Sequence, residues 1–155
     1  MQTKYSIKCR FGPVGDTGPL IPSLNLRVRI LMLEAPDPGF LPKGLTIDHL
    51  MIFDMQEDGG VDVVEILQPL GPGLHERRIA PDPKEEYERL FLEPSDKDLV
   101  EQHAQLEFER AGHLAVFRIA PGTVEKQHLI GPGVNALVGN DELRGISVDL
   151  TGLMK

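Results

Sequence analysis

The stretch GPGVNALVGNDELRGISVDL, residues 131–150, decides how the sequence is interpreted. It consists of two apolar runs that are separated by a polar turn containing Asn140 and Asp141. Asn, Asp and Gly tolerate the left-handed backbone that tight hairpin turns require, and the flanking runs are rich in Val, Ile and Leu. The stretch therefore predicts a β-hairpin that completes a sheet, and not a catalytic or ligand-binding loop.

The same signals predict further hairpins along the chain. Residues 46–67 contain an apolar strand (46–55), the turn EDGG and the partner strand VDVVEIL. Residues 105–119 alternate at Leu106 and Phe108, turn at Ala111 and Gly112, and continue in a second apolar strand. Residues 25–33 predict one strand. Loops are predicted where prolines and glycines cluster, at 12–22, 35–44, 68–73 and 80–86.

The middle of the chain predicts helices. Asp82 is placed to cap a helix that has Pro83 in its first turn. Tyr87, Leu90 and Phe91 would then share one face at i, i+3 and i+4, and Pro94 would end the helix. A second helix is expected after the cap candidate Ser95, lined by Leu99, His103 and Leu106.

Together these elements predict an α+β fold: a largely antiparallel β-sheet built from hairpins, with one or two helices in the middle segment. Length favours a single domain spanning residues 1–155. The alternative is a pair of related β-rich halves, 1–80 and 105–155, joined by a helical segment at 82–104.

Charge argues against nucleic acid as a partner. Sixteen Lys and Arg against 24 Asp and Glu give a net charge of −8, and most of such a surface repels a phosphate backbone. The chain has no Trp and 5% aromatic residues in total, which leaves few side chains for base stacking. The basic pair Arg27 and Arg29 alternates along a predicted strand, as a solvated face does.

Compartment is inferred from cysteine usage and hydropathy. Cys9 is the only cysteine, so an internal disulfide and a Cys-only metal site are excluded. Its apolar surroundings predict a buried, unreactive thiol. No apolar run approaches the 18 residues that a membrane span needs, and the first residues lack the apolar region of a signal peptide. A cytoplasmic protein without membrane contact is expected.

Motifs that specify chemistry are missing from the sequence. No pair of the five histidines has the i, i+4 spacing of a zinc site, and neither a nucleophile elbow nor a phosphate-binding loop occurs. The acidic residues Asp54, Glu57 and Asp58 favour a solvated turn over a cation site. We therefore predict no cofactor and no metal, and we assign no catalytic residue.

Residues 114–150 resemble a family of small bacterial β-rich domains of unknown function. The matching residues are Phe117, Arg118, Ile119, Gly133, Val134, Asp141, Gly145 and Ile146. The segment is about a quarter of the chain. It departs from the family pattern at Ser147, where the family has an acidic residue, and the tyrosine-rich opening strand of the family is absent. The resemblance implies a small β-meander with a helix and implies no activity.

Two functions remain open at this point. The first is a non-enzymatic β-rich module that acts through contacts with a protein partner or through self-association as a homo-oligomer. The second is a small-molecule-binding or metal-dependent enzyme domain whose site is assembled from distant residues, of which His49, Asp54, His75 and Arg78 are the candidates. Convergence of these side chains in one pocket would favour the enzyme, whereas separation would favour the module.

Overall fold

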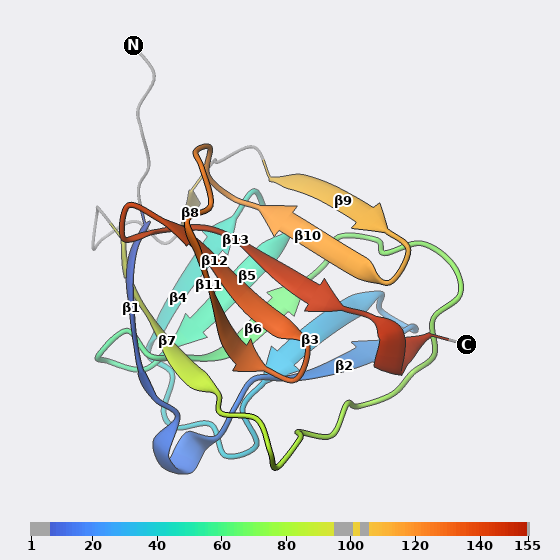
Figure 1. The fold of residues 1–155 in the computed structure, drawn as a ribbon, viewed down its shortest axis with the longest axis horizontal. Helices are drawn as coiled ribbons and strands as arrows, with labels where there is room; N and C mark the ends of the chain where they lie inside the picture. The colour runs from blue at the N-terminus through green and yellow to red at the C-terminus, as the bar shows by residue number, and fades with distance from the viewer. Residues whose placement is uncertain (1–6, 95–100, 103–105, 155) are drawn as a thin grey trace.

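Two β-sheets form the fold. The computed structural model describes residues 7–94, 101–102 and 106–154. Sheet A contains β1 (Ile7–Pro13), β7 (Glu88–Pro94), β9 (Glu107–Ala111), β10 (Leu114–Arg118), β11 (Lys126–Gly131), β12 (Val134–Gly139) and β13 (Glu142–Asp149) (Figure 1). Sheet B contains β2 (Ile21–Asn25), β3 (Ile30–Glu34), β4 (Lys43–Ile47), β5 (Met51–Met55), β6 (Val61–Ile66) and β8 (Glu101–Gln102).

The predicted α+β class is wrong, because the described residues are almost entirely antiparallel strand. Their only helical elements are two three-residue 3-10 turns, η1 (Gly15–Thr17) and η2 (Thr151–Leu153). No helix in the described part of the chain is long and apolar enough to cross a membrane. The prediction of largely antiparallel pairing is confirmed, with the short β4–β8 pair running parallel.

The predicted helix at 82–94 is replaced by one turn and a strand. Asp82 does cap a turn, since its Oδ1 accepts the N–H of Lys84 at 2.9 Å and its carbonyl accepts the N–H of Glu85 at 3.1 Å. The chain then extends as β7, in which Leu90 and Leu92 face the core. β7 pairs with β1 along the whole of both strands, from Ile7↔Pro94 to Pro13↔Glu88. This distant partner satisfies the backbone groups that a helix would have satisfied locally. Of the second predicted helix, Ser95, Leu99 and His103 lie outside the described residues, whereas Glu101–Gln102 form the strand β8 beside β4, so the helix is wrong at those two positions.

The hairpin predicted from residues 131–150 is confirmed. β12 and β13 pair antiparallel up to Gly139↔Glu142. The connecting residues Asn140 and Asp141 have φ of 54° and 59°, the left-handed pair of a two-residue hairpin turn. The β9–β10 hairpin is also confirmed, with Gly112 and His113 as its turn residues, one position later than expected.

Two strands that were predicted as continuous are each divided by a turn. Residues 46–55 are split between β4 and β5 at Asp48 and His49, which have φ of 49° and 58°. The partner strand β6 pairs with β5 as predicted. Residues 25–33 are split between β2 and β3, and Val28 in that turn is 59% exposed. Apolar composition alone did not reveal either turn, because neither contains a Gly or Pro.

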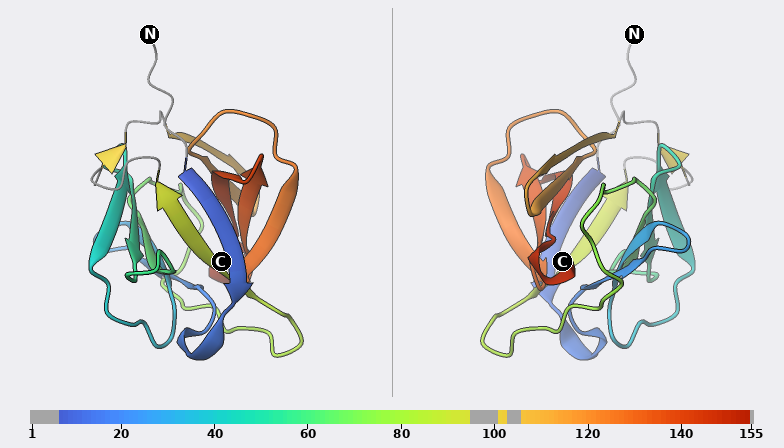
Figure 2. Two further views of the ribbon diagram at one scale, coloured as in Figure 1. Left: turned by 90° about the vertical axis from the view of Figure 1, so that its left-hand side faces the viewer. Right: turned by 90° about the vertical axis from the view of Figure 1, so that its right-hand side faces the viewer.

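A single hydrophobic core lies between the sheets. Figure 2 shows the blue-to-green strands of sheet B on one side and the orange-to-red strands of sheet A on the other. The inner face of sheet B presents two buried rows: Leu24, Leu31, Ile66, Met51 and Ile47, then Leu33, Val64, Phe53 and Leu45. Sheet A contributes the buried side chains Leu90, Leu92, Phe117, Ile130 and Ile146.

The strand β13 holds sheet A together. Along one side it pairs with β12. Along its other side it pairs with β10, from Arg118↔Gly145 to Leu114↔Asp149, and with β1 at Lys8↔Glu142. The order is β11-β12-β13-β1-β7, and β10 and β9 extend the sheet from β13. β9 is therefore an end strand of sheet A.

Candidate functional site

The four residues considered for an assembled site lie on separate parts of the fold. His49 occupies the β4–β5 turn, and Asp54 lies five residues further along, roughly 15 Å away along β5. Arg78 bridges to Ser23 of β2, at the other end of sheet B from β4. His75 lies in the loop beside η2, where its backbone N–H donates to the carbonyl of Leu153 at 2.6 Å.

The acidic turn after β5 is occupied by its own hydrogen bonds. Asp58 accepts the N–H of Gly60 at 2.9 Å, and Lys43 donates to the carbonyl of Glu57 at 2.8 Å. Partial burial raises the pKa of Asp54. In residues 7–94, 101–102 and 106–154, no three His, Cys, Asp or Glu side chains are grouped so that they could hold a metal ion.

A buried ion pair joins the two sheets. Asp62 on β6 is 0% exposed, and its Oδ1 lies 3.0 Å from Nη2 of Arg89 on β7. The other oxygen accepts the N–H of Gly39 at 3.0 Å and the side-chain amide of Gln56 at 2.6 Å. The guanidinium also lies over the ring of Phe91. Both carboxylate oxygens are engaged within the protein, so this pair has a structural role.

A second polar pair fixes β11 beside β7. Nδ1 of His128 lies 2.6 Å from Oε2 of Glu88. The imidazole stacks on Phe11 with ring centroids 3.7 Å apart and an interplanar angle of 8°. This contact was not predicted, because Glu88 was assigned to a helix and no sequence signal links it to His128. Stacking and the hydrogen bond hold the ring in one orientation between three strands.

Cys9 has the character of an unreactive thiol. Burial, followed by the nearby charges of Asp141 and Glu142, raises the pKa of Cys9 to about 11. At pH 8 we expect iodoacetamide to alkylate Cys9 about tenfold more slowly in the folded protein than in urea. The rise from 9.0 to about 11 lowers the thiolate fraction about 100-fold, and the greater nucleophilicity of a more basic thiolate recovers part of this loss. Mass spectrometry of timed samples measures both rates, and equal rates would contradict the prediction.

The strand β9 is held firmly in place. Its Arg110 donates from Nη1 to the carbonyls of Leu70 at 2.8 Å and Pro72 at 3.0 Å. Phe108 stacks against the buried Phe117, with ring centroids 5.2 Å apart. Just before the strand, the N–H of Leu106 donates to the carboxylate of Asp48 at 2.5 Å. β9 is thus anchored to a loop, to the core and to the β4–β5 turn.

One edge of β9 is open in the described part of the chain. β9 pairs with β10 on one side, and no described strand pairs with its other side. A two-residue turn makes Ala111↔Leu114 a hydrogen-bonded pair. The alternation of antiparallel pairs then directs the N–H and C=O groups of Phe108 and Arg110 to the open side. These are the unpaired groups onto which another strand can be added.

The outer edge of β2, unlike that of β9, is covered by another segment. Residues 77–79 run along it, and the N–H of Leu24 donates to the carbonyl of Arg77 at 3.1 Å. The N–H of Ile79 donates to the carbonyl of Pro22 at 2.9 Å. Pro22 itself has no N–H to offer to an added strand. An edge that is covered in this way does not recruit other chains. Among the residues that the structure describes, residues 77–79 cover the edge of β2, and no segment pairs with the outer edge of β9.

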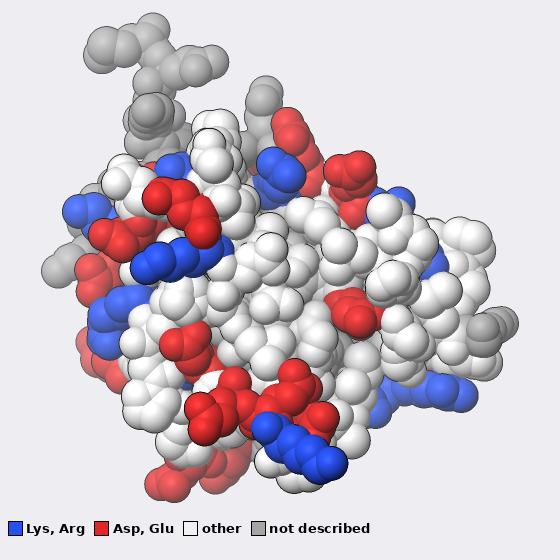
Figure 3. Space-filling view, viewed as in Figure 1, with Lys and Arg blue, Asp and Glu red and all other residues white. Residues whose placement is uncertain are grey.

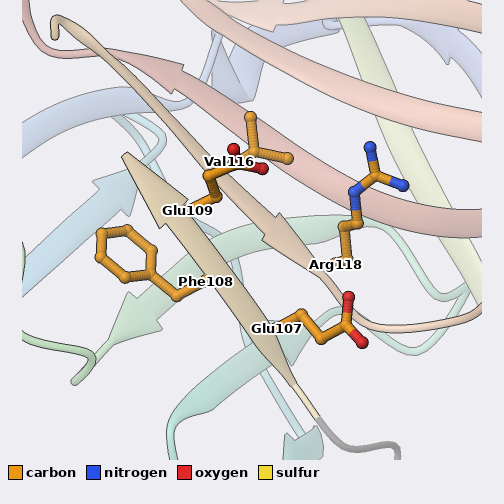
Figure 4. A pocket seen from close by; sticks show the side chains of 5 residues that line it. All are labelled: Glu107, Phe108, Glu109, Val116 and Arg118. Carbon is orange, nitrogen blue, oxygen red and sulfur yellow. The ribbon is translucent and has the colours of Figure 1, made fainter. Parts of the chain in front are cut away.

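Acidic side chains border the open edge. Glu107 and Glu109 lie on the outer face of β9. A cavity of about 420 Å³ is lined by Glu107, Phe108, Glu109, Val116 and Arg118. In Figure 4 the side chain of Phe108 points to the opposite side of β9 from those of Glu107 and Glu109. In the space-filling view, acidic groups with a basic neighbour lie over β9, beside a central area without charges (Figure 3).

The sequence predicted the β9 strand but not its place in the sheet. The alternation at Leu106 and Phe108 indicated a strand, while nothing local shows which strand lacks a second neighbour. A charged residue at every second position, Glu107 and Glu109, is the one available signal, since edge strands carry charges more often than central ones.

Comparisons with protein-family models, with curated proteins and with solved structures found no match to this chain, so the resemblance of residues 114–150 to a family of small bacterial domains stays a prediction.

Proposed function

We propose that this protein is a non-catalytic binding module that takes an extended segment of a partner protein as an added strand along the open edge of β9. The observation that carries the proposal is the pair of outward-facing backbone positions, Phe108 and Arg110, which have no strand partner among the described residues, on a strand that is held by Arg110 and Phe108 side-chain contacts. Strand addition to an exposed sheet edge is a common mode of peptide recognition, in which main-chain hydrogen bonds align the peptide and side chains select it.

Anchoring matters because a mobile edge would have to be ordered on binding. Each immobilised side chain at an interface costs about 0.5–1.5 kcal/mol, and here Arg110 and Phe108 are already held by Leu70, Pro72 and Phe117. Four main-chain hydrogen bonds at about 0.5–1.5 kcal/mol each give a weak interaction by themselves. Side-chain contacts must therefore supply the selectivity and much of the affinity.

Self-association through this edge is disfavoured by charge. If two copies of β9 paired antiparallel about a two-fold axis at Glu109, the two Glu109 side chains would face each other. With the axis at Phe108, Glu107 of each copy would face Glu109 of the other. Like charges directly opposite each other on a sheet are destabilising. A different protein is thus a better occupant of this edge than a second copy.

Strand addition is testable by amide hydrogen exchange. Heptapeptides selected from a random display library against the folded protein should slow exchange at the amides of Phe108 and Arg110. The amides of Glu107 and Glu109 already point into the β9–β10 ladder and should change little. Peptides that are N-methylated at alternate residues provide the control. Alternate residues of a bound peptide direct their N–H groups toward β9, so methylation of one alternate set removes these donors and methylation of the other set leaves them in place. The proposal is overturned if no peptide is selected, or if the selected peptides slow exchange elsewhere and leave the β9 edge unchanged.

A further inference from the structure

We infer, on the basis of the proposed strand addition, that the bound segment carries Lys or Arg at two alternate positions with an apolar residue between them. The inference names the chemistry of the partner, which the open edge alone does not specify. It rests on the two rows of side chains that end at the open edge of β9.

The outer face of sheet A is arranged in cross-strand rows. One row runs Gln127, Leu137, Gly145, Arg118 and Glu107, and the next runs Leu129, Asn135, Ser147, Val116 and Glu109. Each row stops at a glutamate on β9. The side chains of an added strand would continue both rows, at Cβ distances of about 4.5–5.5 Å from Glu107 and Glu109.

The two carboxylates are available to such a strand. In the part of the chain that the structure describes, neither Glu107 nor Glu109 makes an ion pair within 4.0 Å or a side-chain hydrogen bond. Glu109 lies opposite the apolar Val116 and has no cation directly across from it, whereas Glu107 lies opposite Arg118 without forming an ion pair with it. Opposite charges in direct cross-strand positions are stabilising. The residues that continue these two rows are therefore basic.

The residue between them lies on the other face of the sheet. Phe108 is half-buried there, next to the core residue Phe117. A side chain placed beside Phe108 by the added strand would lie against its ring and would cover apolar surface. The recognised pattern is thus basic, apolar, basic. The protein has a net charge of −8, which attracts a basic segment and raises the rate of association at low salt.

Three synthetic heptapeptides test the pattern: Val alternating with Lys, with Gln or with Glu. At low salt we expect the Lys peptide to bind about tenfold more tightly than the Gln peptide and the Glu peptide to bind most weakly, as measured by calorimetry. Raising the salt concentration should reduce the Lys preference. The double variant Glu107→Gln with Glu109→Gln should bind the Lys and Gln peptides equally, with its affinity for the Gln peptide unchanged.

The matched control has the same net charge. Asp16→Asn combined with Glu86→Gln removes two exposed carboxylates away from β9, so this variant should keep the Lys preference. The inference is overturned if the Lys and Gln peptides bind the unmodified protein equally, or if the control loses the preference as fully as the β9 variant. Equal binding with slowed exchange at Phe108 and Arg110 would overturn the basic pattern alone. If none of the three peptides binds, strand addition along β9 is overturned as well.

Discussion

Asp62→Ala is expected to lower the free energy of unfolding by about 3–5 kcal/mol. The substitution removes the buried carboxylate from the Arg89 guanidinium, whose side chain is 12% exposed, and leaves it only the more distant carboxylate of Asp58, at 4.0 Å. It also removes the acceptor of the Gly39 N–H and of the Gln56 side-chain amide. Removal of one member of a buried pair is costly because the remaining charge and donors lose their partners away from water. The total free energy of unfolding of a domain is about 5–15 kcal/mol, so the expected loss is a large share of the stability of the protein.

Urea denaturation of Asp62→Ala beside Glu93→Ala measures the effect. Glu93 pairs with Arg10 at 3.7 Å, with side chains 64% and 55% exposed, and exposed pairs contribute about 0–1 kcal/mol. The two variants each remove one carboxylate from an ion pair with an arginine, and they differ in burial. Similar losses in both would show that the Asp62–Arg89 contact does not hold the sheets together. Asp62→Asn, which keeps the size of the side chain, should fall between them.

The second large effect is expected at Gly131, in the opening stretch of the hairpin sequence. A Cβ atom at Gly131 would overlap the carbonyl oxygen of Leu20. The N–H of Leu20 donates to the carbonyl of Ile130 at 2.9 Å, so the two segments cannot separate without losing that bond. Gly131→Ala should therefore cost about 1–3 kcal/mol, the usual range for overpacking.

Gly44→Ala is the matched control and should have the opposite sign. Gly44 also lies in a strand, and a Cβ there meets its nearest atom at 3.6 Å, an ordinary contact. Replacing a glycine by alanine, where the backbone conformation suits alanine, stabilises proteins by about 0.4–1 kcal/mol. The reason is that the unfolded chain has less conformational entropy, so less is lost on folding. Thermal denaturation of both variants compares the signs. A stable Gly131→Ala protein would show that Leu20 and Gly131 are not in close contact.

Local signals predicted the hairpins, whereas the failures trace to distant partners. Asn140 and Asp141 specify their turn by themselves, since their side chains tolerate left-handed backbone. The run at 87–92 satisfies two patterns: Tyr87, Leu90 and Phe91 fit a helix, and Leu90 with Leu92 fits a strand. The segment is a strand because it pairs with β1, from which more than 70 residues of sequence separate it. Such pairing leaves no trace in the residues of either strand.

The polar sites were hidden for a related reason. Asp62 was predicted in the partner strand VDVVEIL of the 46–67 hairpin, with no special role. The pairing shifts register, so that Asp54 lies opposite Val63 and Met55 opposite Val61. Asp62 has no partner in that ladder, and its buried side chain meets Arg89, 27 residues away. The open edge of β9 is likewise a property of the whole sheet. Only the glutamates at every second position hinted at it.

The position of β13 in the chain has a consequence for biosynthesis. β13 joins β12, β10 and β1, yet among the described strands it is the last to be synthesised. The strands β2–β6 of sheet B are complete by Ile66 and can pair with one another much earlier. While translation proceeds from there to residue 149, side chains such as Leu33, Phe53 and Val64 lack the opposing sheet that buries them in the finished protein. The nascent chain thus exposes the sheet B side of its future core to solvent, and this surface is what a ribosome-associated chaperone would meet first.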